Sequence, residues 1–123
     1  MSRSSTTFEF VADLTGFRAP DAFVARLPGR LARKQDLLRA LASGLKFPGY
    51  FGYNWDALEE CLNDLSWLGD EARVVILHEH VPLRDQEQRR IYCAILRQAL
   101  ANKRLSLQAI FPESAREEME KYK

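Results

Sequence analysis

The sequence predicts an α/β fold in which a three-stranded parallel sheet is covered by a layer of helices. Three segments have the residue pattern of strands, and segments with helical periodicity separate them. Strands that alternate with helices are joined by crossover connections, which make neighbouring strands parallel. A chain of 123 residues, of which 46% are hydrophobic, can bury a core without disulfides or metal. We therefore expect one domain spanning residues 1–123.

The first half of the chain supplies one expected strand and one long helix. Phe8–Leu14 alternates apolar and polar side chains, which is typical of a strand. Asp21–Arg26 lies between two prolines, and we expect a short helical turn there. Leu31–Leu45 carries leucines at helical spacing and predicts an amphipathic helix.

The second half supplies the other two strands and two more helices. Asn54–Trp67 has the periodicity of a helix, and Asp85–Asn102 that of a longer one. Arg73–Leu77 is a continuous β-branched run, typical of a strand buried on both faces. Leu105–Phe111 alternates apolar and polar residues and predicts the third strand.

The composition of the chain indicates its cellular location and the state of its cysteines. The start is polar and lacks the apolar core of a secretory leader, and no apolar run reaches the length of a membrane span. We therefore expect a cytoplasmic protein. Cys61 and Cys93 lie in apolar helical patterns, so buried reduced thiols are favoured over a disulfide. Residues 1–7 and 113–123 are expected to fray, with a loosely attached helix as the alternative for the second segment.

Charge is segregated along the chain. Residues 47–72 hold six acidic side chains and no Lys or Arg, whereas the whole chain has 18 basic and 17 acidic residues. Asn54 is a candidate N-cap of the helix in this segment, and Trp55 begins its apolar stripe. The polar stripe of this helix and its flanks hold five residues: Asp56, Glu59, Glu60, Asn63 and Asp64.

A simple solvated surface explains only part of this acidic stripe. The helix dipole favours Asp56 in the first turn but gives no benefit to Glu60 and Asp64 further along. These three like charges at i, i+4 spacing cost about a few tenths of a kcal/mol per pair. On charge alone, a solvated face and a binding face both fit the pattern.

The run PGYFGYNWDALEECL, residues 48–62, resembles the signature of the barstar family of ribonuclease inhibitors. That signature is a Pro–x–Tyr–aromatic–Gly loop, then Asn–apolar–Asp–Ala–Leu, then an acid–Cys–Leu helix. The resemblance implies a three-stranded parallel sheet with about four helices. It also implies a monomeric inhibitor, not an enzyme, that uses no cofactor. Its partner would be a guanyl-type or related toxin ribonuclease, against which the chain acts as an immunity protein.

The resemblance also implies which residues meet the partner: Tyr50, Asn54, Trp55, Asp56, Glu59, Glu60, Asn63 and Asp64. Glu60 takes the position of the family's deeply inserted acid, usually Asp, and Asp56 supplies the second acid. Carboxylates can occupy the positions of RNA phosphates through arginine contacts. Tyr50 and Trp55 are the expected aromatic anchors. The alternative is a barstar-like module that binds a protein other than a nuclease.

Four departures from the family pattern bear on the identity of the partner. Glu60 is one methylene longer than Asp, and Glu59 stands where the best-known member carries Trp. On the later helix, Gln98 and Asn102 stand where that member adds acids. The net charge is +1, whereas well-known inhibitors of this kind are acidic.

Two other functions find less support in the sequence. His78 and His80 would share a face of a strand, but two ligands are too few for a metal site, so we expect exposed or capping histidines. Basic residues gather at 26–39 and 84–97, but interspersed acids leave no continuous stripe for nucleic acid. No nucleophile elbow, P-loop or Cys-x-x-Cys motif is present.

Overall fold

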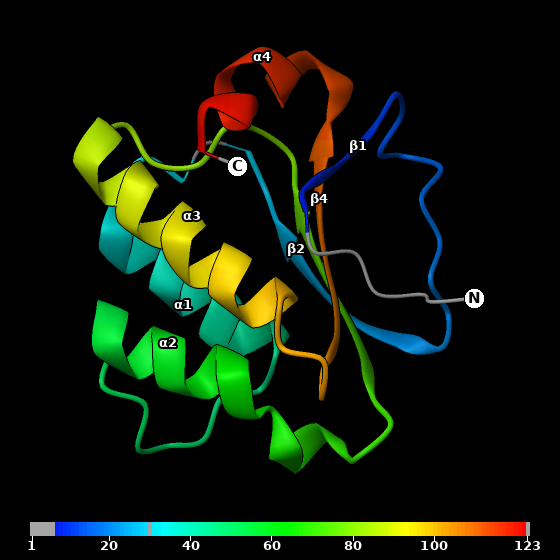
Figure 1. Cartoon of the computed structure of the whole chain (residues 1–123), viewed down its shortest axis with the longest axis vertical. Helices are drawn as coiled ribbons and strands as arrows, with labels where there is room; N and C mark the ends of the chain where they lie inside the picture. Colours follow the sequence, from blue (N-terminus) through cyan, green and yellow to red (C-terminus); the bar gives the residue numbers. More distant parts are fainter. Residues whose placement is uncertain (1–6, 30, 123) are drawn as a thin grey trace.

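The computed structural model describes residues 7–29 and 31–122 and has a four-stranded parallel sheet (Figure 1). The strands are β1 (Glu9–Val11), β2 (Ala22–Leu27), β3 (Arg73–His78) and β4 (Ser106–Pro112), in the spatial order β1-β4-β3-β2. The α/β class and the parallel sheet are confirmed. The expected number of three strands is wrong, because β2 was not anticipated.

Three long helices cover one face of this sheet: α1 (Lys34–Gly44), α2 (Trp55–Asp64) and α3 (Gln86–Leu100) (Figure 1). The main core lies between these helices and the sheet, with leucines of α1 and α2 and the aromatic rings of Tyr92 and Phe111 fully buried. The short helix α4 (Arg116–Met119) follows β4 and lies at one end of the sheet.

The segment expected as a helical turn, Asp21–Arg26, is instead part of strand β2. All six residues of β2 pair in parallel register with β3, from Ala22 opposite Arg73 to Leu27 opposite His78. The prolines that flank the segment suggested a turn, but pairing with a buried strand decides its conformation. Because β2 lies at the edge of the sheet, a proline just past its end costs no ladder hydrogen bond.

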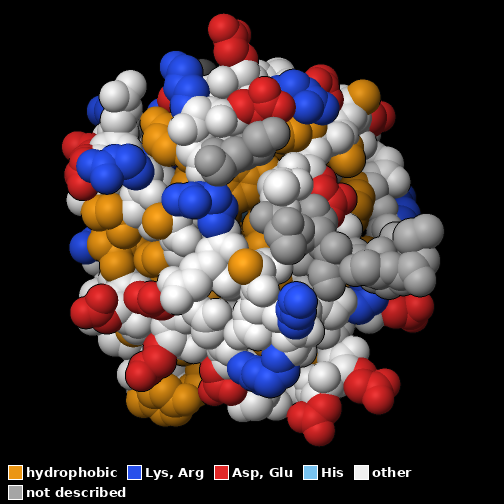
Figure 2. All heavy atoms as spheres, in the orientation of Figure 1, with side chains coloured by type: hydrophobic (Ala, Val, Ile, Leu, Met, Phe, Trp, Pro, Cys, Tyr) orange, Lys and Arg blue, Asp and Glu red, His pale blue; other side chains and the backbone are white. Residues whose placement is uncertain are grey.

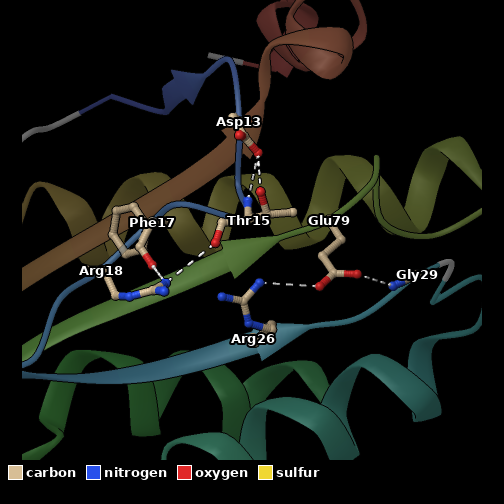
Figure 3. A network of polar contacts seen from close by, with 7 residues as sticks. All are labelled: Asp13, Thr15, Phe17, Arg18, Arg26, Gly29 and Glu79. Atoms are coloured by element: carbon tan, nitrogen blue, oxygen red, sulfur yellow. Dashed lines mark hydrogen bonds and ion pairs between the residues drawn. The ribbon is translucent and has the colours of Figure 1, made fainter.

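The second face of the sheet is covered by the chain that joins β1 to β2. These strands lie at opposite edges, so residues 12–21 cross the whole sheet. Leu14 and Phe17 pack there against a small cluster formed by Val75, Leu77 and Ile110. This connection turns through local polar contacts, where the Asp13 carboxylate accepts from the backbone N–H of Thr15 at 2.9 Å (Figure 3).

The loops after β2 and β3 are tied together at the carboxyl end of the sheet. The Glu79 carboxylate accepts from the backbone N–H of Gly29 at 3.1 Å and from the Arg26 guanidinium at 3.4 Å (Figure 3). Gly29 has φ +48°, in the left-handed region that favours glycine. The backbone N–H of Glu79 also donates to Leu27 O, so the β2–β3 ladder continues one residue past β3.

The C-terminal segment packs on the core over residues 113–122, which corrects the expected fraying. Met119 is fully buried, and the turn Glu113–Ala115 precedes α4. Arg89 of α3 donates to Glu118 at 2.7 Å and holds this segment in place. The remaining residues of the two expected tails, 1–6 and 123, lie outside the described part of the chain.

The two histidines of the expected strand end do not share one environment. His80 is exposed, whereas His78 is buried between β4 and α3 and stacks on the Phe111 ring at 4.0 Å. The expectation that both are exposed or capping is therefore wrong for His78. Cys61 and Cys93 are buried free thiols. Within the described ranges, no helix combines the length and apolar character needed to cross a membrane.

Candidate partner-binding surface

The loop before α2 is built on a cluster of aromatic rings that leaves two tyrosines outside. Phe51 is buried, and its ring lies 4.8 Å from those of Phe47 and Tyr53. The backbone N–H of Phe51 closes a turn on Pro48 O at 3.0 Å. Tyr50 is 76% exposed and Tyr53 is 44% exposed. Among the described residues these two are the exposed large hydrophobic side chains, so apolar surface is concentrated at this loop.

Helix α2 begins at Asn54, as the sequence predicts. The Asn54 side-chain oxygen accepts from the backbone N–H of Ala57 at 2.8 Å, which satisfies one of the free donors of the first turn. Leu58 and Leu62 are buried against the core. These contacts fix the rotation of the helix about its axis, so its polar stripe points to solvent.

Helix α2 is shorter than the predicted range of 54–67. Leu65 adopts a left-handed conformation with φ 53°, and its N–H donates to Cys61 O. A 3₁₀ turn, Ser66–Leu68, then changes the chain direction. The Trp67 indole N–H donates to Leu45 O at 2.9 Å, which ties this turn to the end of α1.

We use the term acidic face for the side chains of Asp56, Glu59, Glu60 and Asp64. Asp56 and Glu60 are exposed, and the other two are partly exposed. In residues 7–29 and 31–122, no Lys or Arg forms an ion pair with any member of this face. Acidic side chains gather over α2 at the lower left of the space-filling view (Figure 2). The face is therefore directed outward, and none of its carboxylates is paired with a described Lys or Arg.

The negative field of this face reaches the thiol beneath it. Burial raises the pKa of Cys61, and the neighbouring carboxylates of Glu60 and Asp64 raise it further. Both carboxylates border a second hollow with Tyr50 and Cys61, which places Tyr50 next to the acidic face.

An open groove brings most of the predicted contact residues together. We call it the α2 groove, and the following residues line it: Tyr50, Gly52, Asn54, Asp56, Ala57, Glu59, Glu60, Asn63, Asp64, Gln98 and Arg104. Seven of the eight predicted site residues are in this set. The remaining one, Trp55, is not.

Trp55 joins α2 to the rest of the protein. Its indole N–H donates to the Gln88 side chain at 3.0 Å, and its ring stacks on Tyr92. The Lys34 ammonium lies 5.6 Å from the ring centroid. Trp55 therefore holds α2 in position through contacts with α1 and α3, and a direct contact with a partner remains a prediction.

The sequence did not reveal Arg104 and Tyr53 as parts of this surface. Arg104 follows α3 in the chain, but its guanidinium donates to Asn63 O at the end of α2. The amide of Asn102 donates to the Asn63 side-chain oxygen at 3.3 Å. No sequence spacing connects residues 63 and 104, so only the folded structure shows this contact. Tyr53 lies within the motif at residues 48–62, but the sequence did not show that its side chain is exposed.

This surface combines carboxylates with exposed aromatic rings. Within the described residues, no cluster of three or more His, Cys, Asp or Glu side chains could hold a metal ion. The acidic face and the exposed tyrosines combine negative charge with aromatic area. Such a surface fits a protein partner with a basic binding site.

A family model described as barstar (barnase inhibitor) matches residues 10–119, nearly the whole chain. The chain belongs to the barstar family. This confirms the resemblance first suggested by residues 48–62, and it extends the similarity well beyond that motif. The α2 groove lies entirely within the matched range. No curated protein matches the chain in a direct sequence search.

Proposed function

We propose that this chain inhibits a barnase-type ribonuclease by covering its active site with the α2 groove and the loop before it. The observation that carries the proposal is the acidic face of α2. Its four carboxylates point outward without ion-pair partners in the described chain, next to the exposed Tyr50 and Tyr53. Barstar-family membership supplies the class of partner.

The charge of the groove suits the active site of a ribonuclease. An enzyme that cleaves RNA must hold phosphates, so its site is lined with cations. A carboxylate presents two acceptor oxygens to an arginine in the same bidentate geometry as a phosphate. Glu60 and Asp56 are the exposed acids of the groove and would occupy phosphate positions. The inhibitor would therefore work by occupying the substrate site, with no chemical step of its own.

The structure also suits rapid and stable association. The Asn54 cap and the Trp55–Gln88 hydrogen bond fix α2 before a partner arrives, so little ordering of the helix backbone is left to binding. Opposite fields on the two proteins speed their encounter, and added salt screens them. We expect a one-to-one complex of monomers that forms in the cytoplasm, where the chain would act as an immunity protein.

The test is inhibition of barnase, measured together with calorimetry. We expect Glu60→Gln and Asp56→Asn each to weaken binding by about tenfold or more, because each removes a charge that faces the enzyme. Asp70→Asn is a matched control, since Asp70 is an exposed acid of the same segment that does not line the α2 groove. Unchanged inhibition by both groove variants, with folding intact, would contradict the proposal.

A second candidate function is a barstar-like module for a protein that is not a nuclease. It is favoured by Arg104, a cation within the groove, and by Glu59, which stands where the best-known member of the family carries Trp. Binding to a captured partner that lacks ribonuclease activity, lost in Glu60→Gln, would support this alternative.

A further inference from the structure

Arg104 is the one basic residue among those lining the α2 groove. Arg104 is held in place at two points, one on its backbone and one on its side chain. The backbone N–H of Arg104 donates to the Asn102 side-chain oxygen at 3.1 Å, and the guanidinium donates to Asn63 O. The cation is therefore fixed at the end of α2, at the border of the acidic face.

Capping the helix does not by itself account for an arginine at this position. A cation near the last turn of α2 is favoured by the helix dipole, and Asn63 O is one of the carbonyls without an intrahelical partner. However, the Asn102 amide also reaches Asn63 O, at 3.5 Å. The carbonyl thus has a neutral donor beside it. A guanidinium has five N–H groups, and its bond to Asn63 O uses a minority of them.

The Arg104 guanidinium shares the groove with carboxylates but is not paired with one. Across the described ranges, Arg104 forms no ion pair, although four carboxylates line the same groove. A partner that covers the groove must cover this guanidinium too. Removing an unpaired cation from water is costly unless the partner provides acceptors. A partner with only cations at this position would also be repelled.

We propose that Arg104 is a specificity-determining residue that selects partners with a carboxylate opposite the end of α2, next to the cations that meet Glu60 and Asp56. The partner surface would then be bipolar, whereas the acidic face alone would accept any basic site. This inference rests on the proposed function, and it adds the charge pattern that separates a cognate ribonuclease from other basic proteins.

The experiment compares the binding of barnase to wild-type protein and to Arg104→Gln, Arg104→Glu and Arg104→Lys. Lys103→Glu is the matched control, because it makes the same charge change on the adjacent exposed residue, which does not line the groove. We expect Arg104→Glu to bind at least about tenfold more weakly than Lys103→Glu. Arg104→Gln should also lose affinity, and Arg104→Lys should lie between it and the wild type, since an ammonium lacks the planar fork.

Whether Arg104→Glu binds barnase more weakly or more tightly than Lys103→Glu decides if Arg104 contacts the partner or only caps the helix. If Arg104 were only a helix cap, Arg104→Glu would make the face more acidic and would bind a basic site as tightly as Lys103→Glu or tighter. That result would overturn the inference about Arg104. The proposed function would still stand if the wild type inhibits barnase and Glu60→Gln loses this inhibition. No inhibition by the wild type would overturn both. Thermal unfolding of each variant verifies that the fold is retained, and Arg104→Lys keeps the charge at the helix end.

Discussion

The Nε2 atom of His78 lies 2.8 Å from the hydroxyl oxygen of Tyr92, and both side chains are buried. The other ring nitrogen, Nδ1, lies 3.0 Å from Ile110 O. A carbonyl only accepts, so Nδ1 carries the hydrogen and Nε2 accepts from the Tyr92 O–H. The neutral imidazole thereby connects β3, β4 and α3. Trp55 of α2 stacks on the same Tyr92 ring, which links this buried contact to the helix that bears the acidic face.

Acidification should destabilise the fold through His78. Burial lowers its pKa from 6.5 to about 4. Between these two pH values the unfolded chain binds more protons than the folded one. The contribution of neutral His78 to the free energy of unfolding is therefore complete above pH 6.5 and decreases as the pH drops toward 4. The shift corresponds to a loss of about 3 kcal/mol by pH 4. Urea unfolding at a series of pH values measures it.

The control for this prediction is His78→Gln. This variant should be less stable at pH 7, because a glutamine cannot reproduce both hydrogen bonds and the stacking on Phe111. Its stability should also change less between pH 6.5 and 4. Equal pH slopes for wild type and variant would assign the acid sensitivity to the carboxylates instead.

Arg89 should matter far more for stability than its neighbour Arg90. Arg89 is buried and donates to Pro82 O at 3.0 Å, to Leu83 O at 2.5 Å and to Glu118. Arg89→Ala leaves these acceptors without their donor, and we expect a loss of about 2–4 kcal/mol.

Arg90→Ala serves as the matched control. Arg90 is exposed, and its described ion pair is with Glu87, three residues earlier on the same helix. We expect a change within about 0.5 kcal/mol. Chemical denaturation of both variants checks the difference. Equal losses would show that the C-terminal segment is not held by Arg89.

The sequence predicted the helices better than the sheet. The repeated leucines of α1 have a helical period that can be recognised without tertiary context. Of the strands, only the continuous apolar run at residues 73–77 gives a comparably local signal. Strand β2 is an edge strand of six residues whose conformation depends on β3, its neighbour in space but not in sequence. His78 was misjudged for the same reason, because its hydrogen-bond partners, Ile110 and Tyr92, come from β4 and α3.

The residues of the candidate site were easier to predict than the sheet, because most of them are continuous in sequence. Seven groove residues between Tyr50 and Asp64 were predicted, since an N-cap and a helical repeat determine which side chains point outward. Arg104 could not be predicted in the same way. It reaches α2 only through the packing of α3 and the turn after it. Trp55 had the hydrophobic character of an anchor, but its partners Gln88 and Tyr92 lie on α3.

Helix α1 lies so close to β2 that Gly44 has no room for a side chain. A Cβ added there would lie 2.7 Å from the Ala25 Cβ and 2.9 Å from its Cα. Gly44→Ala should therefore destabilise the protein by about 1–3 kcal/mol, although alanine is the better helix former. Thermal or urea unfolding measures the change.

Two further variants make this steric argument specific. Ala25→Gly combined with Gly44→Ala should recover part of the loss, because the closest contact disappears. Gly16→Ala adds a Cβ where no atom lies within 4 Å, and it should be neutral or slightly stabilising. A Gly44→Ala variant as stable as wild type would show that α1 can move away from the sheet at little cost.

Tyr50 should contribute to binding without contributing to folding. It is 76% exposed, whereas the neighbouring Phe51 ring holds the loop to the core. Tyr50→Ala is therefore expected to unfold within about 0.5 kcal/mol of the wild type and to bind barnase at least about tenfold more weakly. Because the loss is apolar, the dependence of binding on salt should stay that of the wild type, whereas Glu60→Gln should reduce it. Tyr50→Phe retains the ring and should keep most of the affinity. If Tyr50→Ala binds as tightly as the wild type, the partner touches α2 without covering the preceding loop, and the contact surface is smaller than the α2 groove.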